Sequence, residues 1–396
     1  MRAPSLVRAS SLLVLAVWAS ACASGEALDP IEIVVDSSGE LHLLARRAII
    51  SGHAEIGGPV SFRYAEQRDG RWGVQPAWSS EMGWVGYGPP VYRLLADDDG
   101  RVTIVAGEPN GVRMLTRAEG ASWETIPVDP GLPDDALGAL ADGDLLGGAW
   151  LGASSELRVL AGDWLLESVD GTIARATRTG ATCDPFTVQF SECHFVPTGD
   201  RAGEAIVFRA TFGGGGTFDV RRLDCEADAC TWSDVVDHGL GTPGPLGNTW
   251  ESRIALRDLR GTTFVVHRLS GFGAGPNVRV AGGGRAAVLP GFVYRFGAAA
   301  HPSGGLVVVT STYYDDVLTL HLVTDAAEDP AALDVTSFAL GVLSLRGSPR
   351  LGVLVPPVTP GESERAHIVL ARTESGVTRL VVDLATRETM REDFDL

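Results

Sequence analysis

The chain has 396 residues, and 45% of them are hydrophobic, which is enough to bury the core of one large domain. Its formal net charge is −18, and all of its basic residues are arginine. So acidic a surface is repelled by nucleic acid and by anionic lipid head groups, which excludes nucleic acid as a partner. Because lysine is absent, Schiff-base chemistry and a Walker-type phosphate loop are also excluded.

The segment 1–21 has the pattern of an export signal. Two arginines precede an apolar run at 11–19 that is too short to span a bilayer. The next residues, Ala19-Ser-Ala-Cys22, resemble a bacterial lipobox, although a lipobox usually has leucine where Ala19 stands. The resemblance implies cleavage before Cys22, lipidation of Cys22 and, with Ala23 next, sorting to the outer membrane. Cleavage by the ordinary small-x-small rule would instead release a soluble, secreted protein.

Residues 22–30 are predicted to be a short spacer, and 31–396 the folded domain. Removal of the two signal-peptide arginines changes the formal charge from −18 to −20. An acidic domain is not attracted electrostatically to anionic lipid. We therefore expect the protein to attach to the membrane only through the lipid on Cys22.

A turn of the form Asp-x-x-Gly recurs along the domain, each time before an alternating apolar strand. Its aspartate can cap the turn and its glycine tolerates positive φ, so the chain reverses between two strands. The copies begin at Asp36, Asp97, Asp200 and Asp258, with a weaker one at His301 and a shortened one at Asp142-Gly143. Four tryptophans are expected to open the fourth strand of a set and to pack between sheets: Trp72, Trp123, Trp164 and Trp232.

Period-2 alternation divides the domain into seven sets of four strands. We therefore predict an all-β fold, a β-propeller of four-stranded antiparallel blades. Seven blades are favoured over six or eight, and two stacked β-sandwiches are the alternative architecture. Helical periodicity is confined to the first twenty or so residues and the extreme C-terminus. The predicted sets are 31–78, 91–129, 136–170, 186–237, 250–289, 292–340 and 342–386.

The repeat differs from three familiar propeller repeats. It lacks the Gly-His and Trp-Asp pairs of WD40 repeats, the periodic Gly-Gly of kelch repeats and the Asp-x-Gly of the sialidase Asp-box. Over most of 31–390 it resembles the divergent repeats of bacterial secreted and lipid-anchored propellers. That resemblance implies the fold and says little about the ligand.

Four cysteines besides Cys22 belong to the predicted fourth blade and the residues just before it. In an exported protein we expect two disulfides, and the simplest of three pairings is Cys183–Cys193 with Cys225–Cys230. A zinc site is the alternative, although no Cys-x-x-Cys spacing is present. The Asp97-Asp-Asp-Gly100 turn suggests calcium but lacks further carboxylates at alternating positions. We predict no metal and no cofactor.

One face of the propeller is expected to carry function. In a four-stranded meander, the second-to-third connections and the blade-to-blade connections lie at the same face. The longer ones are predicted at 46–59, 79–90, 171–185, 212–217, 238–248, 270–276, 311–316 and 356–364. Aromatic rings beside carboxylates suit sugar stacking or protein contact, with simple rim packing as the alternative. The candidate binding residues are Trp84, Tyr87, Tyr313, Tyr314, Asp315 and Asp316.

No catalytic residue is predicted, because no Gly-x-Ser-x-Gly or His-Glu-x-x-His motif occurs and the eight histidines are scattered. The favoured function is non-enzymatic: binding or scaffolding of an envelope protein or polysaccharide. The alternative is a glycan hydrolase or lyase whose residues come from several blades. A purely structural coat element is a third hypothesis.

Overall fold

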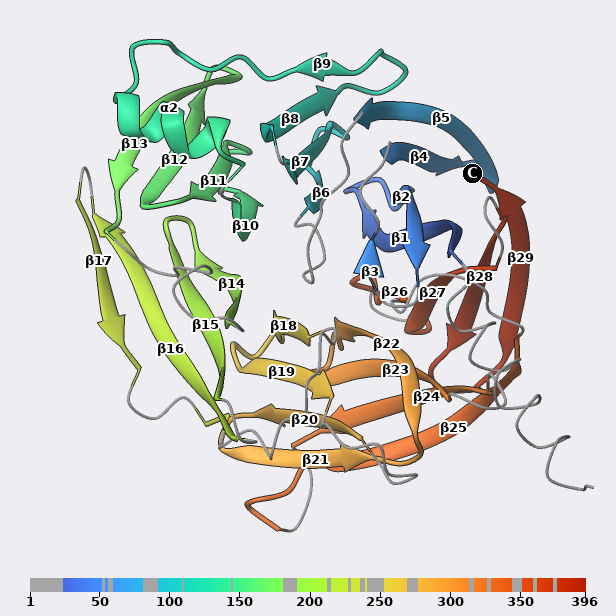
Figure 1. Ribbon diagram of the computed structural model, residues 1–396. Helices are drawn as coiled ribbons and strands as arrows, with labels where there is room; N and C mark the ends of the chain where they lie inside the picture. Colours follow the sequence, from blue (N-terminus) through green and yellow to red (C-terminus); the bar gives the residue numbers. More distant parts are fainter. Residues whose placement is uncertain are drawn as a thin grey trace, which may run out of the picture.

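The structure is a computed structural model that describes residues 24–51, 54–55, 60–80, 92–108, 110–143, 145–180, 191–211, 215–226, 229–235, 239–240, 253–268, 277–312, 317–325, 329–343, 351–358, 362–372 and 376–396. Consecutive strands form seven antiparallel sheets arranged around a central axis (Figure 1). The predicted all-β fold, a seven-bladed propeller of four-stranded blades, is confirmed.

Strands follow one another from the axis outward, so each blade is one continuous stretch of chain (Figure 1). Blade 1 contains β1 (Ser24–Val35), β2 (Leu41–Ser51), β4 (Val60–Arg68) and β5 (Arg71–Ser80), with the short β3 (Ala54–Glu55) paired to β2. Blade 2 contains β6 (Tyr92–Ala96), β7 (Val102–Glu108), β8 (Gly111–Arg117) and β9 (Glu124–Thr125). Blade 3 contains β10 (Leu145–Leu151), β11 (Leu157–Ala161), β12 (Trp164–Val169) and β13 (Thr172–Arg178).

The second half of the ring repeats this plan. Blade 4 contains β14 (Ser191–Gly199), β15 (Ala202–Thr211), β16 (Gly215–Glu226) and β17 (Ala229–Asp234). Blade 5 contains β18 (Arg253–Arg257), β19 (Thr263–Arg268), β20 (Val278–Gly282) and β21 (Arg285–Leu289). Blade 6 contains β22 (Val293–Ala300), β23 (Leu306–Thr312), β24 (Val317–Thr324) and β25 (Asp334–Val342). Blade 7 contains β26 (Gly352–Leu354), β27 (Arg365–Ala371), β28 (Gly376–Asp383) and β29 (Thr389–Asp395).

The third blade differs from its prediction, because a helix stands where the first strand was expected. Helix α2 (Asp134–Ala141) follows Pro133, has two aspartates in its first turn and buries Ala136 and Leu140 on one side. The first strand therefore starts at Leu145, and Trp164 opens the third strand instead of the fourth. Asp142-Gly143 precedes the blade, and the predicted connection at 171–185 contains β13.

The ends of the domain also differ from the predicted boundaries. Strand β1 begins at Ser24, inside the segment predicted as spacer, and Leu28 is buried in the core. Residues 356–364 join the first two strands of blade 7, not its second and third. Strand β26 has only three residues, too few for alternation to reveal it, and this shifted the predicted set by one strand. The C-terminus forms a strand.

The recurring turns are capped as predicted in three blades. Oδ1 of Asp36, Asp97 and Asp258 each accepts two backbone N–H groups of its own turn, at 2.7–3.1 Å. In the weaker copy, Nδ1 of His301 accepts from the backbone N–H of Ser303 at 3.2 Å. Asp200 behaves differently, because it accepts from the N–H of Ala153 in the preceding blade.

Tryptophans pack between blades, as expected. Trp72 of blade 1 stacks on Phe394 of blade 7, with ring centroids 4.4 Å apart, and Trp123 of blade 2 meets Tyr64 of blade 1 edge-on at 5.1 Å. The ring closes there without a strand shared between the terminal blades. Gln67 of blade 1 accepts a 2.6 Å hydrogen bond from Arg379 of blade 7. In the described part of the chain, side-chain packing and side-chain hydrogen bonds join the two ends, and no strand is shared between them.

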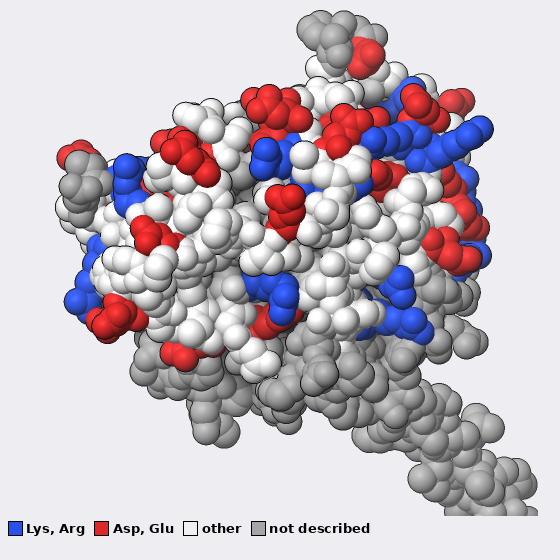
Figure 2. Space-filling view, turned by 90° about the horizontal axis from the view of Figure 1, so that it is seen from above, with Lys and Arg blue, Asp and Glu red and all other residues white. Residues whose placement is uncertain are grey.

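The disc has two distinct faces. We call the face with the turns at 36–40, 97–101, 258–262 and 301–305 the turn face. The opposite face is the loop face. Strand β1 begins there, and in each blade the second strand ends there and the third strand begins there. Seen edge-on, acidic and basic side chains are interspersed over the visible described surface (Figure 2). Within the described ranges, no helix is long and apolar enough to span a membrane.

Candidate functional site

The side chains predicted to bind a partner fall outside the described residues, as do Cys22 and Cys183. Trp84 and Tyr87 belong to 81–91; Tyr313, Tyr314, Asp315 and Asp316 make up 313–316. The strands that flank the two segments are described. Segment 81–91 joins β5 to β6 and segment 313–316 joins β23 to β24, so both start and end at the loop face.

An aromatic cluster lies directly beside the first of these segments. Trp78 stacks on Phe62, with ring centroids 3.7 Å apart and planes 10° apart, and Tyr92 meets Phe62 edge-on at 5.9 Å. Trp78 stands two residues before the end of β5, and Tyr92 is the first residue of β6. Two members of this aromatic cluster therefore belong to the strands that flank the segment 81–91.

A carboxylate and an arginine complete the cluster across the junction of blades 1 and 2. The indole N–H of Trp78 donates to Oε1 of Glu108 at 2.6 Å, and Nε of Arg113 lies 3.3 Å from Oε2. Glu108 is only 7% exposed, whereas the Arg113 side chain is 42% exposed. The carboxylate thus fixes the indole, and the guanidinium faces solvent at the rim. This arrangement can hold a planar or anionic group but offers no free acid or base.

Sequence reasoning missed Trp78 because a β-bulge reverses the alternation of β5. Trp72 and Trp78 are an even number of residues apart, which predicts the same face. The register between β4 and β5 shifts between Phe62 and Arg63, so the two indoles face opposite neighbours. Trp72 packs on blade 7 and Trp78 on the side of blade 2. The nearest signal in the sequence was the pair of tryptophans in one short strand.

A second polar arrangement, nearer the turn face, is a buried chain. Asp36 Oδ2 lies 3.0 Å from Nε2 of His42, whose Nδ1 lies 2.6 Å from the Tyr64 hydroxyl. Tyr64 donates to Glu66 at 3.3 Å, and Arg117 of blade 2 binds Glu66 through both terminal nitrogens. Carboxylate, imidazole and phenol in series have the form of a proton relay. His42 is 2% exposed and Tyr64 is fully buried, so no substrate reaches them.

The pKa shifts agree with a structural role for this chain. Burial alone would raise the pKa of Asp36, but hydrogen bonds from Ser38 and His42 outweigh it and lower that pKa. The pKa of Glu66 is likewise lowered by Arg117 despite burial. Burial and the neighbouring Glu66 raise the pKa of Tyr64. Asp36 and Glu66 are thus held as carboxylates and Tyr64 as a neutral phenol near neutral pH.

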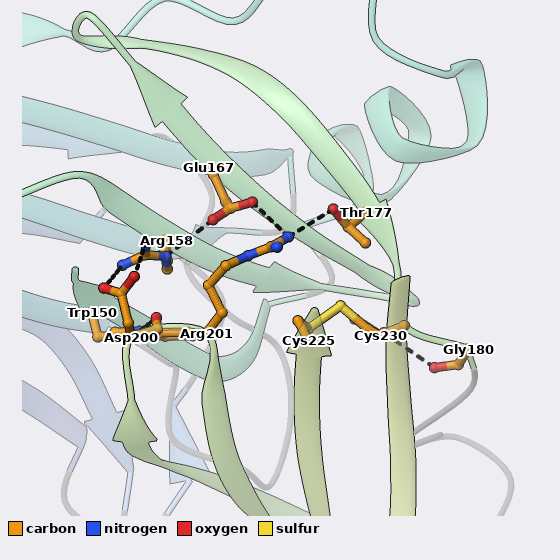
Figure 3. Close-up of a disulfide and its surroundings, with 10 residues drawn as sticks. Trp150, Arg158, Glu167, Thr177, Gly180, Asp200, Arg201, Cys225 and Cys230 are labelled. Carbon is orange, nitrogen blue, oxygen red and sulfur yellow. Dashed lines mark hydrogen bonds and ion pairs between the residues drawn. A yellow bond between two sulfur atoms is a disulfide. The ribbon is translucent and has the colours of Figure 1, made fainter. Parts of the chain in front are cut away.

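A third polar cluster joins blades 3 and 4 (Figure 3). Nη1 and Nη2 of Arg158 bind Oδ1 and Oδ2 of Asp200 at 2.7 and 2.9 Å. Glu167, 3% exposed, accepts from Nε of Arg158 at 3.1 Å and pairs with Nη2 of Arg201 at 2.9 Å. The charges compensate one another inside the junction, so this cluster fixes the two blades together.

The disulfide Cys225–Cys230 lies next to this cluster and confirms one predicted pair (Figure 3). It joins directly paired residues of β16 and β17. Cys193 is also disulfide-bonded. The predicted pairing of Cys193 with Cys183 involves a residue outside the described part of the chain.

Where the structure describes the chain, no group of three or more His, Cys, Asp or Glu side chains could hold a metal ion. At the possible calcium turn, Oδ1 of Asp97 accepts from the N–H groups of Asp99 and Arg101 at 3.0 and 2.8 Å. That turn is capped by its own aspartate.

No family model and no curated protein matches the chain. Among solved structures, an ulvan lyase from a polysaccharide lyase family is 10% identical, with 92% of this chain and 95% of that one covered and a TM-score of 0.47. AofleA from Arthrobotrys oligospora is 11% identical, covering 80% and 90%, with a TM-score of 0.42. The intramolecular trans-sialidase from Ruminococcus gnavus is 11% identical, covering 93% and 94%, with a TM-score of 0.37. At these identities the likeness concerns the propeller fold alone.

Proposed function

We propose that this protein is an exported, lipid-anchored propeller that binds an envelope protein or polysaccharide through its loop face without transforming it. The anchor is the lipid on Cys22, and the destination is the outer membrane. Export is supported by the Cys225–Cys230 disulfide, because disulfides persist in oxidising compartments and are rare in the cytosol.

The observation that carries the proposal is the aromatic cluster at the loop-face end of blades 1 and 2. Its indole is held on both sides, by the ring of Phe62 and by the carboxylate of Glu108. Phe62 and Tyr92 are each 4% exposed and Trp78 is half-buried, so the accessible part of the cluster is the Trp78 indole beside the exposed Arg113. A rigidly held indole beside an arginine is typical of binding hot spots, because little side-chain entropy is lost on contact. Trp84 and Tyr87 lie in the chain between Trp78 and Tyr92, two members of this cluster.

The same cluster favours binding over catalysis. Its buried carboxylate, Glu108, is engaged by both Trp78 and Arg113. A general acid or base must instead reach the proton that it transfers, and must change its protonation state near the working pH. A polysaccharide hydrolase or lyase remains the alternative that the experiment must distinguish.

Photo-cross-linking in intact cells tests the proposal. A photoreactive amino acid is placed at position 84 or 313, with Arg101 on the turn face as the matched control site. We expect one recurrent protein or glycan adduct from both loop-face positions and none from position 101. Arg113→Gln, at an exposed side chain, should lower the adduct yield several-fold.

Two outcomes would contradict the proposal. Adducts of equal yield from all three positions would show no preference for the loop face. If incubation with a polysaccharide panel releases shortened products, and the purified protein does so catalytically, the protein is an enzyme and the proposed non-enzymatic role is wrong.

A further inference from the structure

A cavity of about 150 Å³ lies between blades 5 and 6, near the turn face and away from the aromatic cluster. Its floor is apolar, formed by Phe264 and Leu333. Its polar lining comes from Asp258 and Thr262 in the turn of blade 5, with Arg285 and Asp325. Backbone at Gly282, Gly283 and Gly305 forms the remainder.

The corresponding position between blades 1 and 2 is filled by side chains. His42 is the second residue of β2, follows the Asp36 turn and pairs in register with Glu66. Phe264 is the second residue of β19, follows the Asp258 turn and pairs with Gly282. Phe264 of blade 5 thus takes the place of His42 in blade 1. Gly282, which has no side chain, takes the place of Glu66.

The glycines allow the backbone to pack closely around the cavity. A Cβ on Gly282 would lie 2.4 Å from Cδ1 of Phe264, and a Cβ on Gly305 would lie 2.2 Å from the carbonyl oxygen of Val323. Both distances are well inside van der Waals contact, so neither residue can carry a side chain without rearrangement. Gly305 also has a φ of +82°, which L-residues rarely adopt.

Asp258 supplies the chemistry of the cavity. It is 6% exposed; Oδ1 accepts the N–H groups of Arg260 and Thr262, and Oδ2 accepts that of Gly305 at 2.9 Å. A carboxylate oxygen accepts two hydrogen bonds, so Oδ2 retains an acceptor position. In blade 1 the equivalent Oδ2 of Asp36 takes Nε2 of His42 at 3.0 Å. In blade 5 the backbone N–H of Gly305 is the donor to this oxygen, and no imidazole accompanies it at position 264.

Arg285, which lines the cavity, and Arg260, in the turn after Asp258, both donate to groups of blade 6. Arg260 binds the Asp325 carboxylate at 3.0 Å and the Ser303 carbonyl at 2.8 Å, and Arg285 donates to the Asp325 carbonyl. The lining therefore combines the buried carboxylate of Asp258 with the aromatic ring of Phe264. Both attract a cation, the carboxylate through a charge-assisted hydrogen bond and the ring through its π-face.

The geometry points to this cavity as a binding site for a small organic cation that donates an N–H group, such as an imidazolium or a short primary ammonium ion. The ligand would supply to Asp258 the donor that His42 supplies to Asp36. The site is independent of the loop face and of the function proposed above.

Imidazole at pH 6, where it is mostly imidazolium, is the probe. Binding to the full chain is measured by calorimetry and by amide chemical shifts of Gly282, Gly283 and Gly305. We expect saturable binding that perturbs these amides. Pyrazole, a neutral ring of the same size at this pH, should bind at least tenfold more weakly.

Two variants and one matched control locate the site. Asp258→Asn and Phe264→His should each weaken imidazole binding at least tenfold, the second because the new imidazole occupies the acceptor itself. Asp97→Asn changes the same kind of turn in blade 2 and should leave binding unchanged. Circular dichroism establishes that each variant is folded. No saturable binding to the wild type, equal binding of pyrazole, or undiminished binding to both cavity variants would overturn the inference.

Discussion

Arg158 occupies the space that a side chain at Gly152 would need. A Cβ on Gly152 would lie 1.5 Å from Nη1 of Arg158. Gly152 stands at the start of the first turn of blade 3, where three other blades have a capping aspartate. The carboxylate comes instead from Asp200 of blade 4, which binds both Arg158 and the turn. The turn of blade 3 is thus capped by an aspartate of blade 4, and the same aspartate holds the two blades together.

Arg158→Ala is therefore expected to destabilise the protein strongly. Arg158 is 5% exposed, and its loss leaves the buried Glu167 with Arg201 as its remaining charged partner. Removing one member of a buried ion pair costs about 3–5 kcal/mol. Urea unfolding measures the change. Arg391→Ala, in an exposed pair with Asp393, is the control and should change stability by less than about 1 kcal/mol.

Stability should rise with pH between about 4 and 6.5. Burial lowers the pKa of His321 from 6.5 to about 4, and that of His367 to about 4 with the help of Arg379. The unfolded chain binds these protons more tightly, so stability present at pH 7 is lost as pH falls through this window.

His321→Gln isolates one contribution to this pH dependence. His321 is fully buried and lies between Thr310 and Ser337. Its shift corresponds to about 3 kcal/mol at most between pH 7 and pH 4. We expect the difference in unfolding free energy between these two pH values to shrink by that order in the variant. An unchanged difference would contradict the assigned pKa direction.

Gly143→Ala should be more harmful than Gly39→Ala. Both glycines have positive φ, +70° and +86°, so each substitution carries a conformational cost of about 1–2 kcal/mol. A Cβ at Gly143 would also lie 2.0 Å from the carbonyl oxygen of Glu108, whereas nothing lies within 4 Å at Gly39. Thermal unfolding of the two variants compares them directly. Equal losses would mean that the contact of Gly143 with Glu108 relaxes freely.

Cys22→Ala should move the protein from the membrane fraction to the soluble fraction. The expectation follows from the lipobox-like sequence and from the acidic body, which offers anionic lipid no electrostatic attraction. Fractionation and the mass of the N-terminal peptide measure it. A membrane-bound Cys22→Ala protein, or a wild-type peptide without lipid mass, would contradict lipidation.

The sequence predicted the fold well because its signals are local. Alternation and the turn aspartates Asp36, Asp97 and Asp258 report on neighbouring residues in one hairpin. The helix at 134–141 was missed because eight residues give scarcely two turns of periodicity. Strand β26 was missed because three residues are too few to show the alternation of a strand.

The candidate sites could not be predicted in the same way. Trp78 joins the aromatic cluster only because a bulge turns it away from the face of Trp72. Its partner Glu108 belongs to another blade, and no spacing in the chain relates the two. The cavity beside Asp258 depends on Gly282 and Phe264 facing each other across strands, a relation set by register alone.

The start of β1 at the loop face has a consequence for orientation. Ser24 is two residues after Cys22, and two extended residues span only about 7 Å. If Cys22 carries lipid, the tether is too short for the disc to turn over, so the loop face lies toward the bilayer and the turn face points away. A partner of the loop face would then meet the protein at the membrane surface, while the cavity between blades 5 and 6 would open to the aqueous side.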